Sequence, residues 1–341
     1  MEILAGDIGG TKTILRIVTV QNDGKSFETI FQETYPSQQY RDLVPMVQEF
    51  ATATGTKLPE KACFAIAGPV INNTAQLTNL SWSLDAQRLA QELDIDKVSL
   101  INDFAAVSYG ILGLDQSDLH TLQAGDANPQ SPIAVLGAGT GLGQGFLIPQ
   151  ASGYQVFPSE GGHVDFAART DLEFQFLRYL ENKLQLERIS VERVVSGQGI
   201  VAIYQFLRDQ NYAPESPQIQ DAIQQWEHHE NNKVKKIDPA AVISQAAIAK
   251  EDTLCIKTME MFVSSYGAEA GNLALKLLSY GGVYLAGGIA AKNLPLMTTD
   301  NFISAFKQKG RLSSVVEKMP VYIILNPQVG VIGSVLYALE N

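Results

Sequence analysis

Two loops rich in glycine and threonine, each set between strand-like segments, constrain the fold of this chain most. They read Gly-Asp-Ile-Gly-Gly-Thr at residues 6–11 and Gly-Ala-Gly-Thr-Gly-Leu-Gly at residues 137–143. The segments that flank them are apolar or alternating, as strands are: 3–5 and 13–18 for the first loop, 133–136 and 145–148 for the second. Each loop is therefore predicted to be the tip of a hairpin, whereas Walker and dinucleotide-binding motifs turn from a strand into a helix.

Such a loop suits either of two roles. Its glycines allow positive φ and close approach of a ligand, so that backbone N–H groups can converge on phosphate oxygens. An ordinary tight hairpin uses the same residues. The stretch from Ala127 to Ser159 contains no acidic residue, lysine, arginine or histidine. A phosphate at the second loop would therefore be held by backbone and hydroxyl dipoles, and the alternative is that this stretch is two buried strands.

Length and charge narrow the class of protein. A chain of 341 residues is long enough for two domains, and 25 basic against 36 acidic residues give a net charge of −11. This balance disfavours nucleic-acid and membrane partners and favours small molecules. Cys63 and Cys255 show no Cys-x-x-Cys spacing, which predicts reduced cysteines in a cytoplasmic protein. The N-terminus enters a strand without a signal-peptide pattern or room for a DNA-binding module.

The order of elements predicts an α/β fold. Strands are expected at 27–35, 62–66, 98–101, 282–288 and 321–325, and helices at 43–54, 170–184, 253–278 and 330–339. Thr170 and Glu173 form a predicted capping box. The polar stretch 209–238 is interpreted as a solvated excursion with a short helix, and its role is left unassigned. The small residues of the last helix indicate close packing, back on the first domain.

Three polar groups carry candidate chemistry. Asn102-Asp103 follows a strand, so Asp103 either caps the next helix or lies in a ligand crevice at the strand's carboxyl end. The segment 160–163 places a hydrogen-bond acceptor, Glu160, and a donor, His163, on either side of two glycines without side chains. This arrangement suits the binding of a polyol, but an ordinary surface turn would use the same residues. Glu192, close behind Ser190, is either a ligand group or a first-turn acid.

Segments spread over nearly the whole chain together resemble the bacterial glucokinases, in the hexokinase-like branch of the actin, hexokinase and sugar-kinase superfamily. They are residues 6–11, 65–70, 78–82, 101–104, 137–143, 160–166, 192–197 and 282–289. The resemblance implies a two-domain actin-like ATPase (ribonuclease-H-like) α/β fold with an interdomain cleft. The expected division is a small α/β domain, 1–110 plus 320–341, and a large one, 111–319.

The resemblance also implies the reaction and its residues. ATP, with Mg²⁺, would phosphorylate D-glucose to glucose 6-phosphate, the entry step of glycolysis, in a homodimer. Asp103 would be the base facing the 6-hydroxyl, and Asp7 would reach Mg²⁺ through water, without protein side chains forming a metal site. The residues implied for glucose are Asn102, Asp103, Glu160, His163 and Glu192, and those for ATP are Gly6, Asp7, Ile8, Gly9, Gly10, Thr11, Gly139, Thr140, Gly141, Gly287 and Gly288.

Other readings stay open at this stage. Lys12 stands where some relatives have a smaller polar residue, so its contact with phosphate is undecided. The cysteine-rich zinc motif of related repressors and open-reading-frame kinases is missing, so His163 is not expected to bind metal. A kinase for another hexose and an actin-like, nucleotide-switched protein are the alternatives, and a sugar-responsive repressor is disfavoured by the charge.

Overall fold

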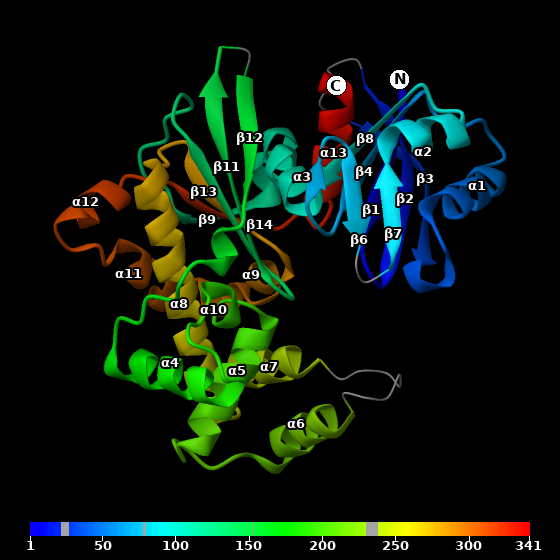
Figure 1. The fold of residues 1–341 in the computed structure, drawn as a ribbon. Helices are drawn as coiled ribbons and strands as arrows, with labels where there is room; N and C mark the ends of the chain where they lie inside the picture. The colour runs from blue at the N-terminus through cyan, green and yellow to red at the C-terminus, as the bar shows by residue number, and fades with distance from the viewer. Residues whose placement is uncertain (22–26, 78–79, 152, 230–237) are drawn as a thin grey trace. The chain divides into compact units, whose positions relative to one another are not determined.

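The computed structural model describes residues 1–341 except 22–26, 78–79, 152 and 230–237. Thr78 and Asn79 of the 78–82 motif, and part of the polar stretch, therefore lie outside the described residues. The chain forms two compact units (Figure 1): Met1–Leu119 with Val156–Pro158 and Asn326–Asn341, and His120–Gln155 with Ser159–Leu325.

The described part of the first unit is built on a five-stranded sheet in the order β3-β2-β1-β4-β8. Its strands are β1 (Glu2–Ile8), β2 (Lys12–Val20), β3 (Phe27–Pro36), β4 (Lys61–Ile66) and β8 (Lys97–Asn102). β1, β2 and β3 are antiparallel neighbours, and β4 and β8 run parallel to β1. A second, small antiparallel sheet consists of β5 (Val70–Ile71), β6 (Thr74–Leu77) and β7 (Trp82–Asp85).

The central strands of this sheet are buried along nearly their whole length, because helices cover the sheet, as is typical of parallel strands. α1 (Leu43–Thr54) and α2 (Ala86–Leu93) share one core with the sheet, which includes Phe50, Phe64 and Trp82. α3 (Asp103–Gly110) and α13 (Val329–Glu340) pack against each other, and α13 contacts β1 and β4.

Glycines allow α3 and α13 to approach this closely. A Cβ on Gly333 would collide with the carbonyl oxygen of Ala106, and a Cβ on Gly110 would collide with that of Val329. The prediction that the last helix packs back on the first domain is confirmed by this contact.

The described residues of the second unit supply most of a six-stranded sheet in the order β12-β11-β10-β13-β14-β9. The strands are β9 (Leu119–Gln123), β10 (Ile133–Ala138), β11 (Leu142–Gln150), β12 (Gly153–Ser159), β13 (Gly282–Ala286) and β14 (Val321–Ile324). β14 pairs in parallel with β13, so residues 321–324, assigned by sequence to the small domain, are part of this sheet.

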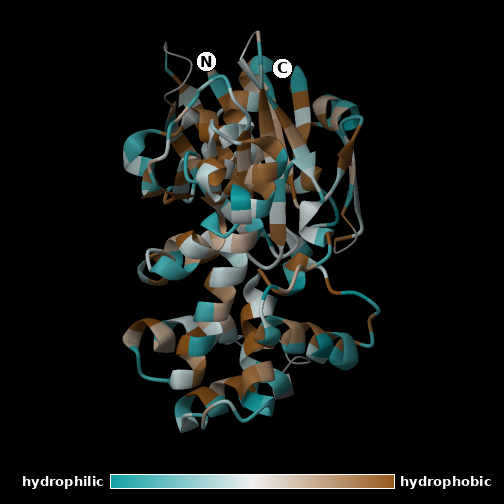
Figure 2. Cartoon of the chain, turned by 90° about the vertical axis from the view of Figure 1, so that its left-hand side faces the viewer, coloured by the Kyte–Doolittle hydropathy of each residue, from teal (hydrophilic) through white to brown (hydrophobic). Residues whose placement is uncertain are grey.

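Helices make up most of the rest of the second unit. They are α4 (Asp171–Leu184), α5 (Gly197–Asp209), α6 (Pro217–His229), α7 (Pro239–Ala249), α8 (Thr253–Leu277), α9 (Gly288–Lys292), α10 (Leu294–Met297), α11 (Asp300–Lys307) and α12 (Ser313–Val316). α8 packs on α5, α7, α11 and β10. The peripheral helices carry both hydrophilic and hydrophobic residues (Figure 2), as expected for helices with one buried side.

Two local expectations were wrong. The polar stretch is not a solvated excursion throughout, because Ile219 and Ile223 of α6 are buried in the core of the second unit. The capping box is only half formed: Thr170 accepts from the Glu173 N–H, but the Glu173 carboxylate accepts from the Arg169 N–H and not from Thr170.

Candidate active site

The first glycine loop is a hairpin tip, as predicted. Ile8 of β1 pairs with Thr13 of β2, and the Gly9 N–H donates to the Lys12 carbonyl at 3.0 Å. Positive φ was one of the two expected uses of the loop glycines, but among the described residues it occurs in neither loop. Gly6 and Gly9 serve close packing: a Cβ on Gly6 would lie 2.5 Å from the Phe64 ring, and one on Gly9 2.9 Å from the Lys12 carbonyl.

The carboxyl ends of β1, β4 and β8 bring the candidate polar residues of the first unit to one edge. Ile8 is in register with Ile66, and Ile66 with Asn102. Asp7, the residue before the last of β1, therefore lies at the same edge at which Asp103 follows β8, where open α/β sheets bind ligands. Partial desolvation raises the pKa of Asp7, and the positive charge of Lys12 acts in the opposite direction.

Asn102, not Asp103, caps α3. Its Oδ1 accepts from the N–H groups of Phe104 and Ala105, both at 3.0 Å, and its Nδ2 donates to the Gly68 carbonyl and to Asp103 Oδ1. These four hydrogen bonds use the full capacity of the amide. The glucose contact implied for Asn102 would need one of them to be given up.

The Asp103 carboxylate is fixed through one oxygen. Oδ1 accepts from the Phe104 N–H at 2.8 Å and from Asn102 Nδ2 at 3.1 Å, and no hydrogen bond to Oδ2 occurs in the described residues. Burial raises the pKa of Asp103 to about 6, the Phe104 N–H opposes this shift, and the negative charge of Asp7 adds to it. An oriented carboxylate with this pKa can accept a proton near neutral pH.

The second glycine loop is also a hairpin tip, between β10 and β11, with Ala138 opposite Leu142. The Gly139 N–H donates to the Gly141 carbonyl and the Gly139 carbonyl accepts from the Gly197 N–H, both at 2.8 Å. The first turn of α5 is thereby attached to the loop.

Glu192 lies beside the second loop. It is in a 3₁₀ turn (Val191–Arg193) whose preceding Ser190 makes no side-chain cap, so it is not a first-turn acid of a longer helix. Its Oε2 accepts from the Leu142 N–H at 3.0 Å, and a Cβ on Gly141 would collide with this oxygen.

The Glu160–His163 segment joins the same region of the second unit. A 3₁₀ turn (Gly161–His163) leaves Glu160 and His163 exposed, with Glu160 Oε2 3.8 Å from His163 Nε2. A Cβ on Gly162 would collide with the Leu142 carbonyl, so only glycine fits at this position. Leu142 thus contacts both this segment and Glu192.

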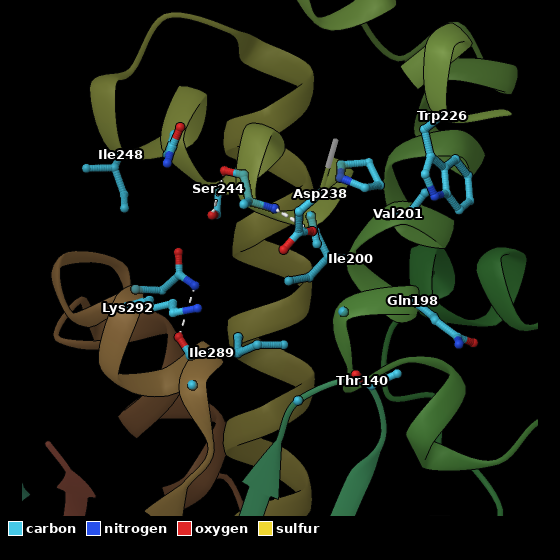
Figure 3. A pocket seen from close by; sticks show the side chains of 18 residues that line it. Thr140, Gln198, Ile200, Val201, Trp226, Asp238, Ser244, Ile248, Ile289 and Lys292 are labelled. Carbon is cyan, nitrogen blue, oxygen red and sulfur yellow. Dashed lines mark hydrogen bonds between the residues drawn. The ribbon is translucent and has the colours of Figure 1, made fainter. Parts of the chain in front are cut away.

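A cavity of about 690 Å³ lies in the second unit. It is lined by Gly139 and Thr140 of the second loop and by Gly288, three residues implied for ATP. Figure 3 shows Thr140 at one end, Trp226 and Val201 on one side, and Ile248 and Lys292 on the other. Gly287, with φ +82°, lies against the β10 backbone, where a Cβ would be 2.5 Å from the Ala138 carbonyl.

Several residues of this cavity were missed by sequence reasoning, among them Trp226, Asp238, Ser244 and Lys292. Ile219, Ile223 and Trp226 recur at helical spacing, a signal that could have placed α6 and its tryptophan on a buried face.

The predicted site residues divide between the units. Residues 6–11, Asn102 and Asp103 belong to the first, and Glu160, His163, Glu192, residues 139–141 and residues 287–288 to the second. The described residues contain no group of three or more histidine, cysteine, aspartate or glutamate side chains placed to hold a metal ion. Within the same residues, no helix has the length and apolarity to cross a membrane.

Comparisons with known proteins place the fold among two-domain sugar kinases. The structure matches a crystal structure of glucokinase from an Antarctic psychrotroph with a TM-score of 0.83 and 30% identity, covering 100% of this chain and 99% of that one. A ROK family glucokinase from Streptomyces griseus, in complex with glucose and AMPPNP, matches with a TM-score of 0.64 and 17% identity over the full length of both chains, a likeness of fold.

The particular family follows from the sequence. Residues 4–341 match the family described as Glucokinase. A glucokinase from Nostoc punctiforme is 59% identical over 336 residues, 98% of each chain. The chain belongs to the glucokinase family, the kinases that phosphorylate glucose.

Proposed function

We propose that this chain transfers the γ-phosphoryl group of ATP to the 6-hydroxyl of D-glucose, with Asp103 as the general base. The observation that carries the proposal is the geometry of Asp103: one carboxylate oxygen is tied to Asn102 and Phe104, and the pKa is raised to about 6. Near pH 7 the group is mostly ionised, yet basic enough to take the proton of the attacking hydroxyl. Positioning is the larger task, because the transition state of phosphoryl transfer needs little covalent help.

Glucose is proposed to contact Asp103, Glu160, His163 and Glu192. Glu160 and His163 are exposed and adjacent, so together they offer an acceptor and a donor to neighbouring hydroxyls. Asn102 is assigned to holding Asp103, because its amide is saturated by protein hydrogen bonds. Glu192 can bind glucose through Oε1 while Oε2 keeps its bond to Leu142.

ATP is proposed to place its adenosine in the cavity of the second unit and its phosphates on residues 6–11 and 139–141. The cavity has apolar walls from Trp226, Ile248 and Ile289, as a purine site requires, and the second loop lies in its lining. Mg²⁺ keeps several waters and binds one or two carboxylates together with substrate phosphates, and the accessible carboxylate of Asp7 fits that role. The ion would neutralise phosphate charge. No phosphate contact is assigned to Lys12.

Finer assignments belong to the same proposal. The chain would be of the hexokinase-like branch, with the actin-like ATPase fold. Its domains would follow the two compact units, so residues 111–119 go with the first and residues 320–325 with the second, unlike the division expected from the sequence. A homodimer in the cytoplasm is the proposed working form. The two cysteines, Cys63 and Cys255, are free and buried, as expected in a reducing compartment.

The test is ADP release, measured with a coupled assay over a panel of hexoses, on the wild-type chain and on Asp103→Ala. We expect turnover with glucose, no measurable turnover in the variant, and ADP binding retained in both. Faster turnover with mannose or an N-acylated amino sugar would identify that sugar, and not glucose, as the substrate. Near-normal turnover of Asp103→Ala would remove Asp103 from the mechanism, and sugar-independent, ATP-driven polymerisation would favour an actin-like switch.

A further inference from the structure

A buried hydroxyl pair lies behind the first glycine loop. Ser37 begins the 3₁₀ turn Ser37–Gln39 that follows β3, and Thr13 is the second residue of β2. Both residues are 0% exposed. The Ser37 hydroxyl donates to the Gly9 carbonyl at 2.7 Å, and Thr13 Oγ1 lies 3.0 Å from Ser37 Oγ.

The direction of these hydrogen bonds follows from valence. A carbonyl oxygen only accepts, so the single hydroxyl proton of Ser37 goes to Gly9. The Thr13 hydroxyl must then donate to Ser37 Oγ. The result is a one-way chain from Thr13 through Ser37 to the Gly9 carbonyl, and the Ser37 N–H adds a second attachment by donating to the Thr11 carbonyl at 3.0 Å.

This chain sets the orientation of one peptide unit of the loop. In a trans peptide the C=O and the following N–H point in opposite directions. Because the Gly9 carbonyl is drawn to Ser37, the Gly10 N–H points away from the buried hydroxyls. Within the described residues the Gly10 N–H has no hydrogen-bond partner in the protein, whereas the Gly9 N–H is used by the Lys12 carbonyl.

We infer that Ser37, held by Thr13, is a positioning residue that aims the Gly10 N–H at a phosphate oxygen of the nucleotide. This inference rests on the proposed function. A donor that is already aimed needs no reorganisation when charge moves during phosphoryl transfer, so its effect falls on the transition state more than on ground-state binding.

The experiment compares Ser37→Ala with Ser334→Ala in the full-length chain. Ser334 is a matched control, because it is also buried in the first unit (1% exposed) and its hydroxyl also donates to a backbone carbonyl, that of Gly330 at 3.0 Å. We expect Ser37→Ala to lower kcat about tenfold, below the full loss of one oxyanion donor, while KM for glucose stays within twofold. Ser334→Ala should keep kcat within twofold even if it lowers the melting temperature equally.

Two further variants keep the inference testable if Ser37→Ala does not fold. Ser37→Thr retains the hydroxyl and should recover most of the lost kcat. Thr13→Val preserves the shape of the side chain and leaves the hydrogen bond from Ser37 to Gly9 in place. It removes the Thr13 hydroxyl that orients Ser37, and should lower kcat about threefold. Wild-type kcat in folded Ser37→Ala, or in Thr13→Val when the alanine variant does not fold, would overturn the inference. Absence of glucose-dependent ADP release in the wild-type chain would instead overturn the proposed function.

Discussion

Replacing Asp103 by asparagine should abolish turnover and at the same time stabilise the first unit. Burial raises the pKa of Asp103 from its ordinary value of 3.8 to about 6, so the folded state disfavours the ionised carboxylate. The difference of about 2 units corresponds to about 3 kcal/mol of stability that the folded state lacks at pH 8. Asparagine keeps the shape and the oxygen that accepts from Phe104 and Asn102, and removes the charge.

The sign of the pH dependence is fixed by the direction of this shift. Between pH 3.8 and about 6 the folded protein binds the proton more tightly than the unfolded chain, so wild-type stability is lost as the pH rises through this window. The advantage of Asp103→Asn should therefore be about 3 kcal/mol at pH 8, fall to about half at pH 5, and be nearly absent at pH 3.8. The same ionisation predicts that wild-type kcat/KM falls about tenfold per pH unit below pH 6.

The assay is urea unfolding followed by tryptophan fluorescence. The chain has two tryptophans, so in a Trp226→Phe background the signal comes from Trp82, which is buried in the first unit. Asp96→Asn, a change at an exposed position of the same unit, is the control and should alter the free energy of unfolding by less than about 0.5 kcal/mol. The reasoning is refuted if Asp103→Asn is no more stable than the wild type at pH 8, or if its advantage does not shrink by pH 5.

Three further predictions concern packing and the nucleotide cavity. Trp226→Ala should raise KM for ATP about tenfold, because the cavity loses an aromatic wall, and should leave KM for glucose unchanged. An unaltered KM for ATP would mean that the adenine of ATP binds outside this cavity. Gly141→Ala should displace the Glu192 carboxylate and lower the melting temperature, whereas Gly139→Ala, whose methyl meets open space, should keep it and weaken ATP binding; equal melting temperatures would contradict this contrast. Gly333→Ala should force α13 away from α3 and destabilise the first unit by about 1–3 kcal/mol or more, read from its urea midpoint, and an unchanged midpoint would count against it.

Local patterns predicted much of the fold. Helix α1 has the bounds that its apolar spacing predicts, Leu43–Thr54, and both glycine loops are hairpin tips because alternating residues flank them. These features depend on neighbours a few residues apart, which the sequence displays directly. β14 shows the limit: its strand character is local, but its membership of the second unit's sheet depends on pairing with β13, from a distant part of the chain.

The candidate site was predicted in part. Asn102-Asp103 was expected at the end of a strand and lies there, but Asn and Asp are both good caps, and only the hydrogen bonds show which of them caps α3. Trp226 was missed because polar residues surround it in the sequence, although the isoleucines before it carry the helical spacing of a buried face. The pKa of Asp103 could not be predicted, since it depends on burial and on Asp7 of another strand.

By itself the sequence determined the α/β class, the two hairpin loops, the residue types available for phosphate and sugar, and the likeness to glucokinases. Only the tertiary structure decided what each polar or glycine residue does: that Glu192 accepts from the Leu142 N–H, that the Asn102 amide is fully used in capping α3 and in its bonds to Gly68 and Asp103, and that Ser37 fixes the Gly9 carbonyl. The physical reason is that hydrogen bonds and close contacts join residues far apart in the chain, and a hydroxyl or carboxylate has no defined role until folding supplies its partner.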